Sequence, residues 1–159
     1  MNALKTVLFL SLSTLILISS APANSQNKVI SIDSSGIKEL MNSKDCPLLI
    51  VATAAWCAPC REELPVLNKM YLKYKDQGLK LVAISLDLAA SDMQRIVDKI
   101  DIKFPVYWGG DKMAFEYSIF GVPTILVMKD GQVNERIIGK RSDKFLEEKI
   151  SRLVEACPP

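Results

Sequence analysis

The sequence predicts one α/β domain in which a mixed central sheet carries helices on both faces. Strand-like segments alternate with segments of helical periodicity along most of the chain. Residues 47–55 (PLLIVATAA) form an unbroken apolar run, which is typical of a central strand covered on both sides. Asp130-Gly131 joins the last two strand-like segments and favours a tight hairpin. A chain of 159 residues, 49% of them hydrophobic, suits a single domain with its own core.

The first elements are expected on either side of this central strand. Residues 29–33 (VISID) alternate between apolar and polar and predict a strand, after which Ser34 or Ser35 is expected to cap a helix. The inward face of that helix would be formed by Ile37, Leu40 and Met41. A second helix is expected over residues 59–77, and Gly78 would end it.

The second half of the chain begins with a strand predicted at residues 79–85. Ser91 and Gln94 have the spacing of a capping box, and an apolar face at helical spacing predicts a short amphipathic helix over residues 91–100. The remaining elements are a short strand or turn, a brief helix, two strands and a last helix capped by Ser142, at residues 104–108, 112–119, 123–129, 132–138 and 142–155. This order resembles the α/β layout of a thioredoxin fold.

The N-terminus has the pattern of an export signal. Lys5 is followed by an uncharged apolar stretch and then by the small residues APA at positions 21–23. This order predicts a secretory signal peptide over residues 1–23, and the alternative is an uncleaved membrane anchor, because residues 6–23 carry no charge. In both cases we expect the domain at residues 28–157 to work outside the cytoplasm, in the periplasm or an equivalent compartment.

The charge and cysteine content narrow the functional classes. The formal net charge is +2, so we expect no nucleic-acid partner. The chain has no histidine, and export would place its four cysteines where disulfides persist. These cysteines all lie beyond the signal segment, at Cys46, Cys57, Cys60 and Cys157.

Cys57 and Cys60 form a C-x-x-C pair within AAWCAPCREELP, and three kinds of chemistry use such a pair. Covalent haem attachment needs a histidine after the second cysteine, where this chain has Arg61. A structural zinc site needs four ligands and would have to recruit Cys46 and Cys157 from far along the chain. We therefore expect no metal and no cofactor. Thiol–disulfide exchange needs only this pair, and a C-x-x-C between a buried strand and a helix is typical of it.

The helix predicted after this motif gives the two cysteines different roles. At a helix N-terminus the unpaired N–H groups and the helix dipole favour a thiolate, so we expect the pKa of the Cys57 thiol to lie below that of a free cysteine. Cys57 is the expected nucleophile, accessible to substrate, and Cys60, one turn into the helix and more buried, is the expected resolving thiol. Arg61 is expected to be a solvated surface side chain, with added positive potential near the pair as the alternative.

Two motifs together carry a resemblance to a known family. WCAPC, with Pro65 five residues after Cys60, and GVPT at residues 121–124 resemble the thioredoxin superfamily. The stretch from LVAISLD to MKDGQV is similar to its exported TlpA/ResA/DsbE-like branch, in which an extra helix and strand are inserted, here matching residues 91–108. The resemblance covers roughly residues 28–155, and the N-terminal part is shorter than is usual in that branch.

The resemblance implies a substrate-binding surface beside the cysteines. Val122-Pro123 would be a cis peptide whose exposed backbone, together with Trp56, takes an extended substrate segment by strand-like hydrogen bonds. A trans proline that opens a strand is the alternative. Thioredoxins commonly carry a buried aspartate six residues before the first cysteine, where this chain has Val51.

Without that aspartate, deprotonation of Cys60 requires another group or water. The candidate carboxylates are Asp87, which follows a strand, and Glu62 and Glu63 in the helix after the motif. We expect each of the three to be an ordinary surface carboxylate, because acidic side chains are seldom fully buried.

The resemblance also implies where the other two cysteines lie. In a thioredoxin-like sheet the strand carrying the motif starts at the pole opposite the active site, which places Cys46 there. The last helix ends at the same pole, which places Cys157 there too. We therefore expect a Cys46–Cys157 disulfide, and two unconnected thiols are the alternative.

These expectations combine into an extracytoplasmic thiol–disulfide oxidoreductase that acts mainly as a reductant. Ala58 and Pro59 include no histidine to stabilise the thiolate strongly, and the resembling branch typically reduces particular proteins, such as those with cysteines awaiting haem attachment in cytochrome c maturation. The expected partners are cysteine-containing proteins and a membrane protein that resupplies electrons, and we expect a monomer. The alternatives are a disulfide-forming or isomerising enzyme and a non-catalytic thioredoxin-like binding module, while peroxide reduction has no supporting motif.

Overall fold

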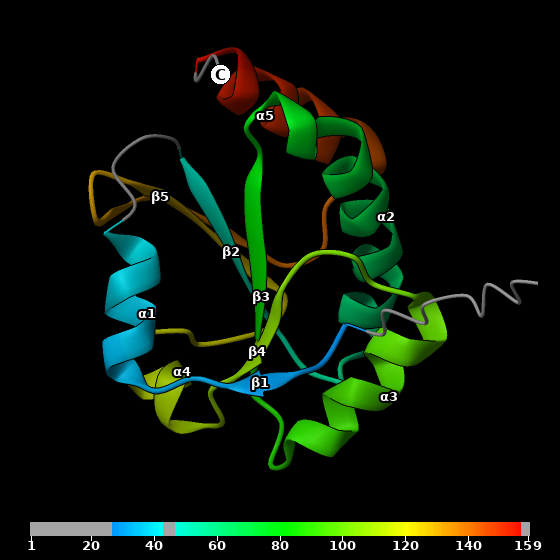
Figure 1. Ribbon diagram of the computed structural model, residues 1–159, viewed down its shortest axis with the longest axis vertical. Helices are drawn as coiled ribbons and strands as arrows, with labels where there is room; N and C mark the ends of the chain where they lie inside the picture. Colours follow the sequence, from blue (N-terminus) through cyan, green and yellow to red (C-terminus); the bar gives the residue numbers. More distant parts are fainter. Residues whose placement is uncertain (1–26, 43–46, 157–159) are drawn as a thin grey trace, which may run out of the picture.

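A six-stranded sheet runs through the protein in the order β1-β4-β3-β2-β5-β6 (Figure 1). The computed structural model describes residues 27–42 and 47–156. The strands β1 to β6 span Ile30–Ser31, Leu48–Thr53, Lys80–Ser85, Val106–Trp108, Thr124–Lys129 and Gln132–Ile138. β1, β4, β3 and β2 run parallel to one another, whereas β5 pairs antiparallel with both β2 and β6. The predicted mixed sheet of a thioredoxin fold is therefore confirmed.

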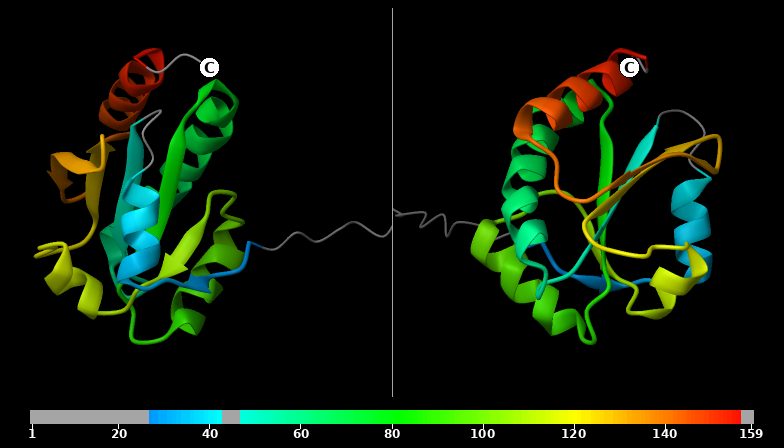
Figure 2. Two further views of the ribbon diagram at one scale, coloured as in Figure 1. Left: turned by 60° about the vertical axis from the view of Figure 1, so that its left-hand side comes forward. Right: turned by 180° about the vertical axis from the view of Figure 1, so that it is seen from behind.

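Helices cover both faces of this sheet (Figure 2). The helices α1 to α5 span Ser34–Met41, Ala58–Tyr74, Ala90–Ile100, Lys112–Glu116 and Asp143–Glu155. The larger apolar cluster joins the sheet to α2, α3 and α5, and the smaller one joins it to α1 and α4. α3 and β4 form the helix and strand that the sequence predicts as an insert.

β2 lies at the centre of the core because both of its faces are apolar. Its six residues are all buried. Leu49 and Val51 belong to the larger cluster, while Leu48 and Ile50 belong to the smaller one, as the two-residue period of a strand requires. Each such side chain contributes about 1.5 to 3 kcal/mol to folding, so the strand that leads into the C-x-x-C motif is firmly held.

The pairing of the strands brings three loops together at one edge of the sheet. β2 and β3 are parallel and end at the same edge, and β5, which is antiparallel to β2, begins there. The loops that follow Thr53 and Ser85 and the loop that precedes Thr124 are therefore neighbours. The loop after Thr53 carries the motif and lies in the middle, because β2 lies between β3 and β5.

Two of the predicted helix caps are wrong. α1 is capped by Asp33, whose Oδ1 accepts the Gly36 N–H at 2.9 Å, and not by either serine. α3 has Ala89 at its N-cap and no side-chain cap, so Ser91 lies inside the helix. Gln94 Oε1 accepts the Val29 N–H at 2.8 Å and ties the segment before β1 to the helix. The predicted Ser142 cap of α5 is confirmed.

The predicted turns are confirmed by the backbone. Gly78 closes the turn after α2 with a φ of 97°. Asp130 and Gly131 form the hairpin with φ values of 52° and 77°, the left-handed conformation that such tight turns need. Within the described residues, no helix is both long and apolar enough to cross a membrane. Residues 1–23, Cys46 and Cys157, on which further predictions rest, lie outside the described residues.

Candidate active site

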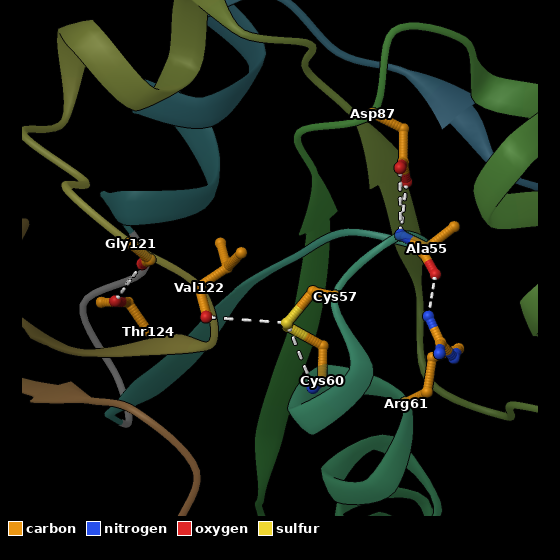
Figure 3. Close-up of a disulfide and its surroundings, with 8 residues drawn as sticks. All are labelled: Ala55, Cys57, Cys60, Arg61, Asp87, Gly121, Val122 and Thr124. Carbon is orange, nitrogen blue, oxygen red and sulfur yellow. Dashed lines mark hydrogen bonds between the residues drawn. A yellow bond between two sulfur atoms is a disulfide. The ribbon is translucent and has the colours of Figure 1, made fainter.

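Cys57 and Cys60 form a disulfide at the N-terminus of α2, with an S–S distance of 2.06 Å (Figure 3). Cys57 is the N-cap residue of the helix, and its Sγ accepts the Cys60 N–H at 3.2 Å. Pro59 lies in the first helical turn, where its missing N–H costs nothing. The helix N-terminus thus directs a backbone donor, the Cys60 N–H, at the sulfur of Cys57.

The disulfide is covered rather than open to solvent. Cys57 is 4% exposed and Cys60 is 1% exposed. The expectation that Cys60 is the more buried of the two is confirmed, but the expectation that Cys57 is accessible is wrong for the disulfide form. The pair packs against Ala54 and Val122, and the Val122 carbonyl oxygen lies 3.6 Å from Cys57 Sγ. Val122 therefore covers the sulfur of Cys57 in the disulfide form.

The Val122-Pro123 peptide bond is cis, as predicted. The loop before it is held by Thr124 Oγ1, which donates to the Gly121 carbonyl oxygen at 2.7 Å (Figure 3). Pro123 is buried and Val122 half-buried, whereas Trp56 is 68% exposed next to the first cysteine. The residues predicted to bind substrate are thus brought together around the disulfide.

The backbone N–H and the carbonyl oxygen of Ala55 are both hydrogen-bonded to side chains, as Figure 3 shows. The Ala55 N–H donates to both carboxylate oxygens of Asp87, at 3.0 and 2.9 Å. The Ala55 carbonyl oxygen accepts from the Arg61 guanidinium at 2.6 Å. Asp87 also accepts from the Ser85 hydroxyl at 2.7 Å, and its carbonyl oxygen accepts from the Trp108 indole at 2.8 Å. These hydrogen bonds fix the turn between β2 and α2, which contains Cys57.

Two sequence-based expectations change in consequence. Asp87 is 1% exposed and so is not a surface carboxylate. Its burial is tolerable because amide and hydroxyl donors satisfy its oxygens. Arg61 lies at the surface as expected, but it bonds to the motif loop instead of being fully solvated.

Replacing Asp87 by alanine is expected to lower the free energy of unfolding by roughly 2 to 4 kcal/mol. The Ala55 amide and the Ser85 hydroxyl would lose their acceptor, and each orphaned donor costs about 1 to 3 kcal/mol. Urea unfolding of the oxidised protein measures the loss. Asp76→Ala is the matched control, because its side chain is 83% exposed, and its effect should stay within about 0.5 kcal/mol. Equal losses in the two variants would contradict the anchoring role of Asp87.

The two glutamates after the motif differ from each other. Glu62 is exposed and pairs with Lys140, whose hydrogen bond lowers the pKa of the Glu62 carboxyl. Glu63 is 2% exposed, so the expectation of a surface carboxylate is wrong for it. Its Oε1 accepts the Arg141 N–H at 2.8 Å, and its buried Oε2 has no hydrogen-bond partner in the described structure. Desolvation raises the pKa of Glu63 above its usual value.

Glu63 shares the buried face of α2 with Cys60, one helical turn away. A carboxyl whose pKa is raised by burial is a stronger proton acceptor than an ordinary exposed carboxylate. The described residues contain no cluster of three or more potential metal ligands. The site combines the Cys57–Cys60 pair with a buried carboxyl one turn further along the same helix.

A thioredoxin-fold sheet whose C-x-x-C disulfide caps a helix beside a cis-proline loop defines the thiol–disulfide oxidoreductase class. The comparisons with known proteins agree. The sequence profile of the AhpC/TSA family matches residues 22–136, which is more than half of the chain. The chain belongs to the AhpC/TSA family.

The individual relatives are thiol–disulfide oxidoreductases. The chain is 34% identical over 117 residues to the thiol-disulfide oxidoreductase ResA of Bacillus cereus, covering 72% of this chain and 68% of that protein. A thiol:disulfide interchange protein, DsbE, from Chlorobium tepidum matches with a TM-score of 0.65 and 28% identity, over 72% of this chain and 84% of that one. A secreted disulfide oxidoreductase of Mycobacterium tuberculosis has the same fold, with a TM-score of 0.62 and 18% identity over 69% and 84% of the two chains. The protein is a ResA-like thiol–disulfide oxidoreductase.

Sequence reasoning missed some residues around the site. It did not predict the hydrogen bonds that join Ala55 to the side chains of Asp87 and Arg61. The position of Asp87 directly after a buried strand could have indicated that its carboxylate is buried. It also gave no role to Leu88 and Phe120, which lie in the two loops flanking the motif and are 87% and 95% exposed.

Proposed function

We propose that this oxidoreductase works outside the cytoplasm and mainly reduces disulfides in partner proteins. The observation that carries the proposal is the position of Cys57, which caps α2 and whose sulfur accepts the Cys60 N–H. The same donor would stabilise a thiolate in the reduced protein. The dipeptide between the cysteines, Ala58-Pro59, offers no histidine that would favour the reduced form strongly enough to make a powerful oxidant.

The reaction proceeds through two exchanges. The Cys57 thiolate attacks one sulfur of the substrate disulfide, that bond breaks, and the leaving substrate sulfur takes up a proton. Cys60 then loses its proton and attacks Cys57 Sγ, which breaks the mixed disulfide and releases the second substrate thiol. Two electrons pass from the enzyme to the substrate. The Cys57–Cys60 disulfide is the oxidised product of this half-reaction.

Glu63 is the proposed acceptor for the Cys60 proton. It is the carboxyl that is both buried and one turn from Cys60 on the same face of α2. Asp87 is engaged by its hydrogen-bond donors, and Glu62 is exposed and paired with Lys140. Glu63 in turn retains an oxygen without a hydrogen bond.

The substrate is expected to lie across Trp56 and Val122-Pro123. Trp56 is exposed, and Val122 lies in contact with the sulfur of Cys57. An extended segment carrying the substrate cysteine would pair with the backbone of Val122, next to the attacking sulfur. The substrates are therefore proteins with accessible cysteines, which includes apocytochromes with cysteines awaiting haem.

The proposed location rests on the export signal expected in the first residues of the chain. Residues 1–23 are proposed to act as a signal peptide or, if uncleaved, as an anchor, and residues 28–157 to form the working domain. In an oxidising compartment the disulfide formed in each turnover has to be reduced again, so a membrane protein that donates electrons is proposed as a second partner. The protein is proposed to work as a monomer.

The direction of electron flow is tested by redox equilibrium. Purified protein is equilibrated with graded dithiothreitol or glutathione buffers, and the fraction of reduced Cys57 and Cys60 is read by alkylation and mass spectrometry. We expect a potential nearer to the approximately −270 mV of thioredoxin than to the approximately −120 mV of strong oxidants. A value near the oxidising end would instead identify a disulfide-forming enzyme. A failure to reduce insulin under any condition would indicate a binding module.

A further inference from the structure

Large apolar side chains stand exposed on the two loops that flank the motif. Leu88 directly follows the buried Asp87 after β3, and it is 87% exposed. Phe120 directly precedes the Gly121-Val122 segment before β5, and it is 95% exposed. Trp56, next to Cys57 in the central loop, is 68% exposed. Exposed apolar surface of this extent at one site is typical of a surface that binds a partner.

The sheet order places the three loops that carry these side chains side by side at the edge that holds the disulfide. β2 lies between β3 and β5, so the loop carrying Trp56 lies between the loop of Leu88 and the loop of Phe120. In Figure 3, Asp87 and Gly121, the chain neighbours of Leu88 and Phe120, lie on opposite sides of Cys57. A segment bound across Cys57 would therefore meet one apolar side chain on each side of its own cysteine.

The same three loops carry little charge of their own. Residues 54–60, 86–90 and 117–124 contain one charged side chain, Asp87, and it is buried. The chain as a whole is 24% charged, so these loops are poorer in charge than the chain as a whole. The exposed Arg61 borders these loops, because its guanidinium bonds to the Ala55 carbonyl oxygen.

We infer that Leu88 and Phe120 are specificity-determining residues that select substrate cysteines flanked on both sides by large apolar residues. This inference rests on the proposed function and adds the class of substrate segment to it. Such segments are buried in folded proteins, so the substrates would be chains that have not completed folding. Burial of one leucine or phenylalanine side chain by each contact contributes about tenfold in affinity or in second-order rate constant.

The test uses two short synthetic peptides, each with one cysteine held in a mixed disulfide with glutathione. In one peptide leucine and phenylalanine flank the cysteine, and in the other serine takes both places. The pre-reduced protein attacks the mixed disulfide and becomes oxidised, and the released thiols are measured to give a second-order rate constant. We expect the apolar peptide to react about a hundredfold faster than the serine peptide, since two contacts act together.

The variants assign this preference to the two loops. Leu88→Ala and Phe120→Ala should each reduce the preference about tenfold, and the double variant should nearly abolish it, with the rate for the serine peptide unchanged. Leu72→Ala is the matched control, because Leu72 is 48% exposed on α2 away from the cysteines and should keep the full preference. Equal rates for the two peptides, or a preference that survives in the double variant, would overturn the inference. A wild-type protein that reduces neither peptide would overturn the proposed function itself.

Discussion

We expect Cys57→Ser to abolish disulfide reduction, lowering the rate by at least about a thousandfold. Serine keeps the N-cap geometry, because its oxygen can accept the Cys60 N–H as the sulfur does. It removes the sulfur that caps α2 and that begins the exchange in the proposed mechanism. Turnover of insulin with dithiothreitol as the final reductant measures the effect, and the circular dichroism spectrum should remain that of the parent.

The complementary variant, Cys60→Ala, should stop the reaction halfway. Cys57 would still attack the substrate, but nothing would break the mixed disulfide, so a covalent complex should accumulate. Non-reducing electrophoresis detects this complex, and a reductant should cleave the mixed disulfide and release the two proteins. If the roles of the two cysteines are reversed, the complex forms with Cys57→Ser instead, and the assignment of nucleophile and resolving thiol is wrong.

Glu63→Gln should slow the resolution of the mixed disulfide without destabilising the fold. Without a group that accepts the Cys60 proton, resolution of the mixed disulfide should slow by about a hundredfold, while the first attack by Cys57 is unaffected. Rapid mixing with a fluorescent disulfide resolves the two steps. The hydrogen bond from the Arg141 N–H can be kept by the glutamine oxygen, so the fold should survive the change.

The same variant should be more stable than the parent at neutral pH. Desolvation raises the pKa of Glu63 above its ordinary value of 4.5, so the stabilising contribution of this group is complete below pH 4.5 and is lost as the pH rises through its folded-state pKa. Glutamine never ionises and avoids this loss. The gain in unfolding free energy should therefore disappear as the pH falls below 4.5.

Glu62→Gln is the control for both measurements, because Glu62 is the adjacent residue but is exposed and paired with Lys140. It should change the rate of resolution by less than about threefold. If Glu63→Gln resolves the mixed disulfide as fast as Glu62→Gln does, Glu63 is not the proton acceptor. If Glu63→Gln is instead destabilised at every pH, a packing defect accounts for its slower reaction.

The sequence alone predicted the order of the elements and the position of the disulfide, and each for a local reason. The apolar run predicted the buried strand β2, and the dipeptide Asp130-Gly131 predicted the hairpin. Both predictions depend only on residues that are adjacent in the sequence. The spacing of Cys57 and Cys60 and the helix after them predicted the redox pair. The cis bond at Val122-Pro123 was implied by the family resemblance rather than by the local pattern.

The errors concern side chains whose partners are distant in sequence. Gln94 has capping-box spacing but bonds to Val29, 65 residues away. Asp87 and Glu63 were expected at the surface because an acidic residue usually is, and their donors, Ala55 and Arg141, come from other elements. The burial of such groups depends on tertiary packing that propensities and periodicities do not describe.

The most direct test is the pH dependence of alkylation at Cys57 in the reduced protein. Pulses of iodoacetamide at a series of pH values, followed by mass spectrometry of the peptide containing both cysteines, give the reaction rate of each sulfur. We predict that Cys57 reacts as a thiolate well below the pKa of about 8.5 of a free cysteine, while Cys60 stays unlabelled. A Cys57 that reacts only as fast as Cys60, or only above that pH, would show that its sulfur is neither activated nor reachable.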